Sequence, residues 1–585
     1  MSENDNVTNE KKSQNKLSRR NFLKGGAMAA AGFVSSSLLL SGCATKEKVL
    51  REPQPKQVPT GDWLGEPPTI ADSEIKQTAE ADVVIVGAGV AGMFAARAAS
   101  EAGASVIVIE KAGTFQCRSG QYGTIDNKIQ KKLGIKIDKN AAILENMKQM
   151  GYRSDQRMWK YWADHSGEDF DWLLELAPDL EVLPENATSL VDNKLNLLVM
   201  HYPSPPTYKS EEENSPTYPT VMSFLPNQDE IIKRVYKKCL DQGCKFIFSN
   251  AARKLIRPDN QGKVKGVICQ NVKGTYTKVL AKKGVILATG DYGNNKEMMT
   301  HFVPWAADCL NVYPNKDAKG NPTNTGDGHI MGSWIGGKIE DGPHAPMVHT
   351  LGGPLGVDAY FLANTNGKRF VNEDIGGQQL SCALYRQPNN FGWQIFDDNW
   401  PEQLEFMGVS HGSVNHCVPD DKNPKLKDCQ WTLGRTAYTS REDLLKARDL
   451  VVANSLEELV TKIAPDAKVQ KTLLASIKRY NELCAKGVDD DFGKTSKRLF
   501  PIATAPFYAG KMMAGALLVN MGGFTCDPET GNVLDKDYKD IEGLYAAGNV
   551  MGCRFVGDYP VVTAGVSHAY ALVYGRLVGT VVAKI

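Results

Sequence analysis

The sequence predicts an α/β protein organised around a parallel β-sheet. The main observation is the stretch from Ala81 to Lys111, which reads ADVVIVGAGVAGMFAARAASEAGASVIVIEK. Ala81–Val86 is a short apolar run with β-branched residues, typical of a strand that is buried on both faces. A helical pattern follows the glycines, and a second apolar run, Ser105–Ile109, comes before the closing Glu-Lys pair. Strand, helix and strand over about 30 residues form a complete βαβ unit.

The connection between the first strand and the helix has the glycine spacing of a dinucleotide-binding turn. Gly87 allows the tight turn, Gly89 lets the backbone approach a pyrophosphate, and Gly92 lets the helix pack closely on the strand. The diphosphate would lie at the helix N-terminus, whose free N–H groups attract anions. Glu110, after the second strand, would accept hydrogen bonds from the adenosine ribose. An acid at this place favours FAD or NAD over NADP, and a glycine-rich turn without a ligand is the alternative.

Residues 1–42 predict an export signal. Two adjacent arginines in Ser18–Lys24, reading SRRNFLK, precede a mildly apolar run that ends at Leu40. This pattern is typical of a twin-arginine signal, which directs folded proteins across the membrane. Glycine and serine interrupt the apolar run, so a membrane-spanning helix is the weaker alternative.

The end of this signal resembles a lipobox. Leu40-Ser41-Gly42-Cys43 predicts that Cys43 is acylated and becomes the mature N-terminus, on the outer face of the cytoplasmic membrane. Residues 43–79 contain five prolines and are expected to form a tether. Export in the folded state suits a protein that receives a tightly held cofactor in the cytoplasm.

Composition excludes some classes of function. Removing residues 1–42 takes away six Lys/Arg and three Asp/Glu, so the formal net charge falls from +1 to −2 and no basic character for nucleic acid remains. The remaining length can bury at least two cores. The twelve cysteines include no C-x-x-C spacing. We therefore expect isolated, reduced thiols, although distant cysteines could still converge on an iron–sulfur cluster.

Further elements are expected along the chain. Aromatic residues at roughly helical spacing between residues 140 and 180 are expected to lie in the core rather than in a substrate cage; they are Trp159, Trp162, Phe170 and Trp172. The other expected elements are a helix over Glu230–Asp241, strands over Cys244–Asn250, Gly266–Val272 and Gly284–Leu287, a helix opening at Thr325–His329, and a last helix over Val566–Lys584.

The ordered motifs of the chain resemble those of the fumarate reductase/succinate dehydrogenase flavoprotein superfamily, which also contains ketosteroid dehydrogenases, urocanate reductase and exported reductases. The resemblance covers residues 80–585. The motifs are GAGVAG (87–92), EK (110–111), ATGDY (288–292), TGDG (325–328), GKRFVNE (367–373), DFGK (491–494), PFY (506–508) and GLYAAGN (543–549). The resemblance implies a Rossmann-like FAD-binding domain in two pieces, residues 80–342 and 512–585, with an inserted α+β capping domain at residues 343–511.

The same resemblance implies how the cofactor is held. The FAD contacts that it implies are Gly87, Gly89, Gly92, Glu110, Ser119, Ala252, Asp327, Asn549 and Ser567. No histidine matches the site of covalent flavin attachment in the respiratory members, so the FAD is expected to be non-covalent. No appended FMN-binding or multihaem domain is expected. A separate haem or FMN protein of the membrane or envelope is therefore expected to supply electrons.

The substrate positions depart from the family pattern. The arginine that serves as the acid in fumarate reductases falls at Gly377, a carboxylate-binding histidine at Leu518 or Val519, and a carboxylate-binding arginine near Val562. His349 falls within a residue of the other substrate-binding histidine. A dicarboxylate needs fixed positive charge at both ends, because a buried unpaired carboxylate costs several kcal/mol. The sequence thus predicts a larger, more apolar pocket for an enone, a steroid-like ring system or an aryl acrylate.

Hydride chemistry at a flavin also needs a proton donor or acceptor. Tyr559, followed by a proline, is similar to the tyrosine that polarises the substrate carbonyl in ketosteroid dehydrogenases. Arg554 is the alternative acid or anion anchor, and His349 is a third candidate. Tyr122 and His568 are weaker candidates for a role in the site, because each could simply pack beside the flavin. Each of these residues could instead be a packed polar group.

Three functions remain open at this point. The first is a membrane-tethered reductase of an activated C=C bond, acting on a small unsaturated substrate in anaerobic respiration. The second is a dehydrogenase that oxidises a steroid-like substrate, and the third is a flavin electron-transfer lipoprotein without an organic substrate. The capping motifs DFGK and PFY argue against the third, since an electron carrier needs no closing lid. Export without a nicotinamide site favours the first over the second.

Overall fold

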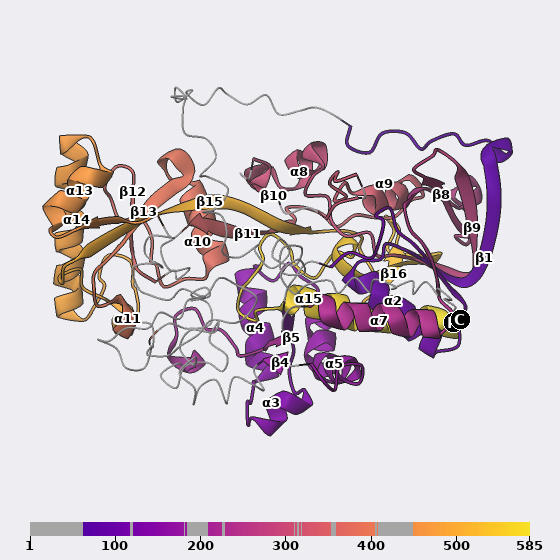
Figure 1. Ribbon diagram of the computed structural model, residues 1–585, viewed down its shortest axis with the longest axis horizontal. Coiled ribbons are helices and arrows are strands. Elements are labelled where there is room, and N and C mark those ends of the chain that lie inside the picture. Colours follow the sequence, from indigo (N-terminus) through magenta and orange to yellow (C-terminus); the bar gives the residue numbers. More distant parts are fainter. Residues whose placement is uncertain are drawn as a thin grey trace, which may run out of the picture.

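The computed structural model describes most of the chain from residue 62 on (Figure 1). The end of the predicted tether is therefore described, and its last residues form a 3-10 turn over Asp72–Glu74 and, from Ile75, the start of a strand. The described residues are 62–117, 121–180, 182–183, 209–224, 228–308, 311–312, 315–317, 319–352, 359–403, 406 and 449–585. The predicted signal, the lipidation site Cys43 and the predicted FAD contact Ser119 lie outside them.

The larger lobe contains an eight-stranded sheet of order β16-β17-β9-β1-β2-β6, with β8 joining β7 to β9. Strand β1 (Ile75–Val86) lies between β2 (Val106–Ile109) and β9 (Tyr276–Leu287), and both neighbours run parallel to it. The other strands are β6 (Lys245–Ile247), β7 (Asn250–Ile256), β8 (Gly266–Asn271), β16 (Asn532–Leu534) and β17 (Asp540–Ala546). The predicted α/β fold with a parallel central sheet is confirmed.

Strand β1 is buried on both faces, as its apolar run predicts. Val83 and Ile85 pack in the core that contains Phe94, while Val84 and Val86 belong to the core on the other face. Alternate side chains of a strand point to opposite faces, so an unbroken apolar run is needed where both faces are covered.

Three helices lie side by side near the sheet in Figure 1: α2 (Val90–Glu101), α7 (Asp229–Asp241) and α15 (Val566–Lys584). Helix α15 approaches α2 closely because its contact surface carries glycines. A Cβ at Gly579 would lie 2.3 Å from the Ala95 carbonyl oxygen. The last helix has the bounds expected from the sequence, and its Gly575 packs on the start of α2, where a Cβ would lie 2.8 Å from the Ala91 carbonyl oxygen.

The second lobe, with α13, α14, β12 and β13 at the left of Figure 1, has its own sheet. The sheet has the order β10-β15-β13-β12, with β11 and β14 also pairing with β15. Strand β15 (Phe507–Met521) continues from this lobe toward the larger one, so the predicted domain boundary at residues 511/512 falls inside a strand. The other elements of this lobe are β10 (Asn311–Val312), β11 (Ala345–Gly352), β12 (Phe361–Asn364), β13 (Phe391–Phe396), β14 (Val451–Ala453), α10 (Gly377–Tyr385), α11 (Trp400–Gln403), α13 (Leu456–Ile463) and α14 (Ala467–Lys486).

The helical region 140–180 consists of two helices, α4 (Lys139–Gln149) and α5 (Gln156–Leu174). The four aromatic residues expected in the core are all buried, which confirms that expectation; they are Trp159, Trp162, Phe170 and Trp172. The single strand expected over Cys244–Asn250 is wrong, because the chain turns at Ser249 (φ 56°) between β6 and β7. The remaining elements are β3 (Tyr122–Gly123), β4 (Val182–Leu183), β5 (Val221–Phe224), α3 (Lys128–Lys132), α8 (Lys296–Phe302) and α9 (Asp327–Trp334).

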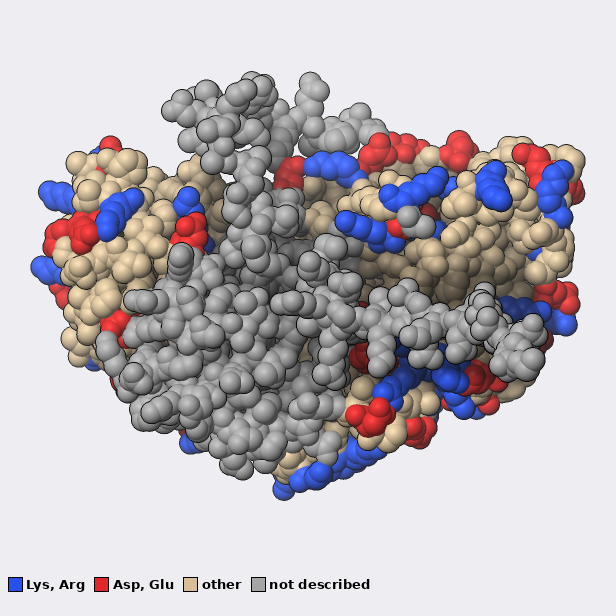
Figure 2. All heavy atoms as spheres, viewed as in Figure 1, with Lys and Arg blue, Asp and Glu red and all other residues tan. Residues whose placement is uncertain are grey.

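Cysteines in the described part of the chain are free thiols. The expectation that they are isolated is wrong for one pair, since the Cys239 and Cys244 thiols are hydrogen-bonded to each other where α7 ends. Within the described ranges no helix combines the length and apolar character needed to span a bilayer, and no group of acids, histidines and cysteines could hold a metal ion. On the face shown in Figure 2, acidic and basic side chains are interspersed over the described surface.

Candidate FAD and substrate sites

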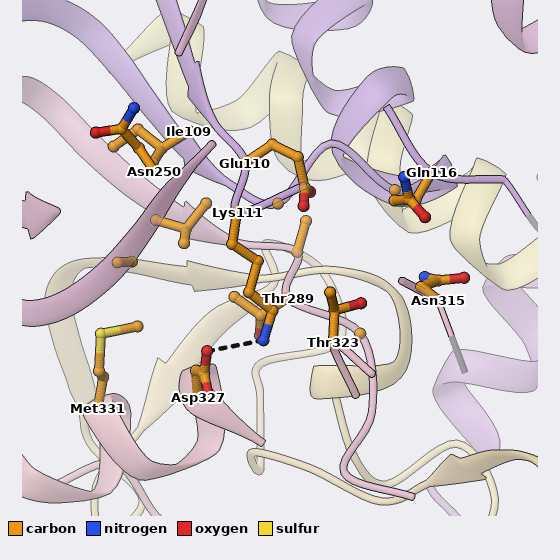
Figure 3. A pocket seen from close by; sticks show the side chains of 16 residues that line it. Ile109, Glu110, Lys111, Gln116, Asn250, Thr289, Asn315, Thr323, Asp327 and Met331 are labelled. Atoms are coloured by element: carbon orange, nitrogen blue, oxygen red, sulfur yellow. Dashed lines mark hydrogen bonds and ion pairs between the residues drawn. The ribbon is translucent and has the colours of Figure 1, made fainter. Parts of the chain in front are cut away.

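A cavity opens where β1, β2 and β9 end (Figure 3). This is the carboxyl edge of parallel strands, where open α/β sheets bind their ligands. The cavity has a volume of about 570 Å³, including space that is open to solvent. Five predicted FAD residues line it: Gly87, Gly89, Glu110, Ala252 and Asp327.

The three glycines of the turn differ in what surrounds them. A Cβ at Gly87 (φ 107°) would lie 2.3 Å from the Ala288 carbonyl oxygen, and one at Gly92 would lie 2.0 Å from the Gly87 carbonyl oxygen. Close packing therefore requires both. A Cβ at Gly89 would meet no heavy atom within 4 Å, and no side chain caps the N-terminus of α2 there. Gly89 thus faces free space beside unbonded N–H groups, the arrangement that a diphosphate needs.

The Glu110 carboxylate is held by backbone groups on both sides. Its oxygens accept hydrogen bonds from the N–H of Ala88 at 2.8 Å and of Ala112 at 2.7 Å. Burial raises the pKa of Glu110, although the two N–H donors and the nearby Lys111 charge oppose the shift. The carboxylate therefore fastens the glycine turn to the end of β2, a role that the sequence did not predict. Each oxygen keeps a lone pair for the predicted ribose contact.

Lys111 is a residue of the cavity that the sequence reasoning did not assign. Its Nζ lies 2.9 Å from Asp327 Oδ2 and 2.8 Å from Thr325 Oγ1, and Figure 3 shows the ion pair. Burial raises the pKa of Asp327, but the charge and hydrogen bond of Lys111 outweigh it, so the pKa is lowered overall. Lys111 belongs to the EK pair and Asp327 to TGDG, so the signal was present in two motifs that are far apart in the chain.

The residues around the cavity fit an adenine dinucleotide. The Thr289 hydroxyl oxygen is buried and has no hydrogen-bond partner among the described residues, which leaves it available to a ligand. Further polar side chains come from Gln116, Asn250 and Asn315 (Figure 3). With the open position at Gly89 and the free α2 N-terminus, these groups supply both neutral donors and acceptors for the hydroxyls and phosphates of FAD.

Two other predicted FAD contacts, Asn549 and Ser567, do not line the cavity; Asn549 lies near the start of α2, and Ser567 lies at the start of α15. Asn549 lies in a 3-10 turn over Gly548–Val550, and a Cβ at Gly548 would be 2.8 Å from Ala91 Cβ at the start of α2. Ser567 lies in the first turn of α15, whose N-cap, Gly565, has a positive φ of 80°. Both places suit the flavin end of a bound FAD.

The segments that carry the altered substrate positions meet in the structure. Helix α10 begins at Gly377, and its neighbour Gly376 is so close to the 557–562 loop that a Cβ there would lie 2.1 Å from Val561 Cγ2. In the sheet, Val519 of β15 is opposite Met347 of β11, and the pairing is irregular at Leu518. The backbone of His349 pairs with that of Ala516 in the sheet, and the His349 side chain is not among those that the structure describes.

Tyr559 is buried near the N-terminus of α15. Its ring packs on Phe555 at 5.1 Å between centroids. Burial raises the pKa of Tyr559, although the Ser567 N–H that interacts with the phenol and the Arg554 charge oppose the shift. Of the weaker candidates, Tyr122 and His568 lie together, with ring centroids 6.2 Å apart.

Arg554 is almost fully buried, with 1% exposure. Its Nε donates to the Met551 carbonyl oxygen at 3.0 Å, and its guanidinium lies 5.4 Å from the Tyr570 ring centroid. Neither terminal nitrogen has a hydrogen-bond partner within the described part of the protein. Burial lowers the pKa of Arg554. Its two terminal nitrogens, with four N–H donors, thus remain available to an anion or to water.

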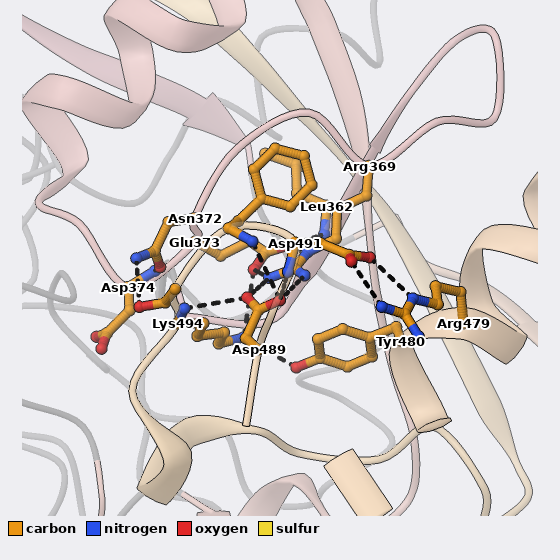
Figure 4. Close-up of polar contacts among 12 residues, drawn as sticks. Leu362, Arg369, Asn372, Glu373, Asp374, Arg479, Tyr480, Asp489, Asp491 and Lys494 are labelled. Atoms are coloured by element: carbon orange, nitrogen blue, oxygen red, sulfur yellow. Dashed lines mark hydrogen bonds and ion pairs between the residues drawn. The ribbon is translucent and has the colours of Figure 1, made fainter. Parts of the chain in front are cut away.

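The motifs GKRFVNE and DFGK meet inside the second lobe (Figure 4). Arg369 donates to both oxygens of Glu373, each at 2.8 Å, and to both oxygens of Asp489, at 3.0 and 2.7 Å. Lys494 Nζ adds a contact of 3.5 Å to Glu373 and donates to the Tyr480 hydroxyl at 3.0 Å. Arg369, Glu373 and Lys494 of the two motifs, with Asp489 two residues before DFGK, form a buried ionic core of the lobe.

Comparisons with known proteins agree with this site. The family described as FAD binding domain matches residues 82–566, and the twin-arginine translocation pathway signal sequence matches residues 16–34. The vinyl phenol reductase of Lactiplantibacillus plantarum is 27% identical over 531 residues, which cover 85% of this chain and 94% of that protein. A probable fumarate reductase of Shewanella frigidimarina is 28% identical over 516 residues, or 86% of this chain and 74% of that protein.

Among solved structures, the 3-ketosteroid-delta4-(5alpha)-dehydrogenase of Rhodococcus jostii has a TM-score of 0.63 at 21% identity, over 88% of this chain and 99% of that one. At this identity the likeness supports the fold. The comparisons confirm the predicted superfamily, FAD as the cofactor and a twin-arginine export signal.

Proposed function

Because the chain belongs to the FAD-binding family of fumarate reductase-like oxidoreductases that act on C=C and CH–CH bonds, we propose that it is an exported reductase of an unsaturated substrate that is not a dicarboxylate. The bound FAD, when reduced, supplies the hydride for an activated C=C bond. The proposed substrates are an enone, a steroid-like ring system or an aryl acrylate.

The observation that carries this proposal is the loss of charge where the substrate segments meet. Gly377 opens α10, Val519 lies in β15 and Val562 is fully buried in the loop before α15. In fumarate reductases the matching positions carry the acid and the carboxylate-binding groups. Arg554 could pair with one carboxylate placed here, but a second carboxylate would lose its hydration without gaining a cation, which costs several kcal/mol. A weakly charged, bulkier molecule pays no such penalty.

Tyr559 is the proposed proton donor. Its raised pKa keeps the phenol protonated at neutral pH, so it can hold a proton for the substrate carbon or polarise a carbonyl. Its place beside the first turn of α15 supports this role, since that turn is the proposed flavin-binding end. Arg554 is the proposed anion anchor, because its terminal nitrogens have no described partner. His349 remains a proposed contact by its place in β11.

The relatives support a substrate of this kind. The vinyl phenol reductase carries the name of a neutral alkene substrate, and this chain covers 94% of its length. A second candidate function is the oxidative direction, a ketosteroid-type dehydrogenase, which Tyr559-Pro560 and the likeness in fold to a ketosteroid dehydrogenase favour. The electron-transfer lipoprotein is the third candidate, and the capping lobe argues against it, since an electron carrier needs no closing lid.

The proposal includes four further parts. The FAD is bound non-covalently, and residues 80–342 with 512–585 form its domain while 343–511 form the cap. Cys43 carries a lipid that holds the protein on the outer face of the cytoplasmic membrane. A haem or FMN protein of the membrane or envelope supplies electrons to the flavin, in anaerobic respiration.

The test is an anaerobic assay of the purified FAD-loaded protein. The flavin is reduced with a viologen dye, and unsaturated compounds are screened for reoxidation. We expect little turnover of fumarate, and a loss of 10²-fold or more with the true substrate in Tyr559→Phe, on the order of a missing general acid. Tyr508→Phe is the control, because that hydroxyl donates to Asp398 inside the cap. Rapid turnover of fumarate would contradict the proposed pocket, and normal rates in Tyr559→Phe would remove the proton donor.

A further inference from the structure

Asp558, the residue before Tyr559, is hydrogen-bonded to helix α10 of the second lobe. Asp558 accepts hydrogen bonds from two glutamines of α10: Gln378 Nε2 at 3.0 Å to Oδ1 and Gln379 Nε2 at 3.2 Å to Oδ2. Its Oδ1 also accepts the N–H of Tyr559 at 2.8 Å. We call Asp558, Gln378 and Gln379 the clasp. The clasp joins the first turn of a cap helix to the loop that carries the proposed proton donor.

Gln378 is itself fixed to a third segment. Its Nε2 donates to the Pro346 carbonyl oxygen at 2.9 Å, and its Oε1 accepts the Val348 N–H at 2.7 Å. The side chain is 1% exposed. Both N–H donors of this amide and one of the two lone pairs of its oxygen are therefore used between β11 and Asp558. Moving α10 away from the loop would leave buried polar groups unpaired on both sides.

The charged form of Asp558 is fully stabilised only while α10 lies against the loop that carries Tyr559. Burial raises the pKa of this carboxyl, while Gln378, Gln379 and the Tyr559 N–H stabilise the charged form. Two of these three donors come from α10. If the helix moves away, the carboxylate keeps only the N–H of its neighbour. The close approach of Gly376 to Val561 shows that the two segments pack without spare room.

We propose that Asp558 is a positioning residue that fastens cap helix α10 to the loop of Tyr559 through Gln378 and Gln379. It thereby sets the distance between the cap and the proton donor once a substrate is enclosed. Its catalytic meaning rests on the proposed function, since Tyr559 touches the substrate and Asp558 acts through it.

The first test is hydrogen–deuterium exchange of the FAD-loaded protein without substrate. In Asp558→Ala we expect the amides of α10 and β11 to exchange about tenfold faster, the effect of losing one to two hydrogen bonds, while α14 is unchanged. Asp558→Asn keeps Oδ1 as an acceptor and should give a smaller change. Asn399→Ala is the control, because that amide bonds to Asp397 and Thr504 of the second lobe, outside α10 and β11. Unchanged exchange in α10, or faster exchange in every element, would overturn the clasp.

The second test is a double-mutant cycle in the assay. Asp558→Ala should raise KM for the enclosed substrate about tenfold, and adding Gln379→Ala should cost nothing further, because its acceptor is already gone. Additive losses would contradict the clasp. Gln379→Ala alone, which leaves β11 untouched, serves if Asp558→Ala does not fold. Failure of the proposed function would look different: Tyr559→Phe would react normally while Asp558→Ala still loosened α10.

Discussion

Two buried arginines of this protein differ in their ion-pair partners. Arg369 in the cap is bonded to two carboxylates, Glu373 and Asp489, whose side chains are both 0% exposed. Arg554 in the larger lobe has no carboxylate within ion-pair distance in the described structure, and its terminal nitrogens lack partners. Glu340 acts on it only through longer-range attraction.

The difference separates a structural cation from one that is available for function. A buried ion pair that is fully bonded is costly to break from one side, because the partner charge stays behind. A buried cation without a partner already carries the cost of desolvation, so its removal takes away little stability. A residue kept under that cost is a candidate for binding, which fits the proposed anchor role of Arg554.

Arg369→Met should give the largest loss of stability. It leaves Glu373 and Asp489 buried without their main partner, which costs about 3–5 kcal/mol. Denaturant unfolding of the FAD-loaded protein measures the change. Arg479→Met is the control, because its pair with Asp491 is exposed on both sides and should cost less than about 1 kcal/mol. Equal losses in the two variants would contradict the distinction.

The next effect is a dependence of stability on pH. Burial raises the pKa of Glu340 to about 7 from an ordinary 4.5, although the N–H groups of Cys553 and Gly523 oppose the shift. Between these values the folded state binds the proton more tightly, so stability falls as pH rises from about 4.5 to 7, by about 3 kcal/mol. Glu340→Gln should lose this part of the slope. Parallel curves for the two proteins, measured by urea unfolding at pH 5 and 7.5, would be the contrary result.

Breaking the Lys111–Asp327 pair at the cavity should cost less stability than either of the two preceding effects. Lys111 and Asp327 have side chains 25% and 32% exposed, so Lys111→Met should cost at most about 1 kcal/mol of unfolding free energy. Its FAD affinity should fall about tenfold, the effect of losing one charge-assisted contact. Fluorescence of released FAD measures this affinity. Lys296→Met, which removes an exposed contact to Asp308, should bind FAD normally.

Arg554→Met should change stability least. The replacement removes an unpaired charge and keeps an apolar stem against Tyr570, so we expect a change within about 1 kcal/mol. Its activity with the true substrate should fall if Arg554 anchors an anion. A loss of several kcal/mol would show that Arg554 has a buried partner and belongs with Arg369.

The FAD site could be predicted from local sequence patterns. The strand, the glycine turn, the helix and Glu110 lie within about 30 consecutive residues, and the structure places them as expected around one cavity. The bounds of α15 followed from its apolar pattern and from the chain end. The strand expected over Cys244–Asn250 failed because an apolar run does not reveal a turn at a serine with positive φ.

The sequence by itself determined the export signal and the dinucleotide-binding turn for FAD, because each is formed by residues that are close together in the chain. Only the tertiary structure decided the pairings on which the proposed chemistry depends. Lys111 meets Asp327 across 216 residues, Asp558 meets Gln378 across 180, and Arg369 meets Asp489 across 120. No periodicity connects such partners, since the energy of burying a charge depends on what the rest of the fold places beside it.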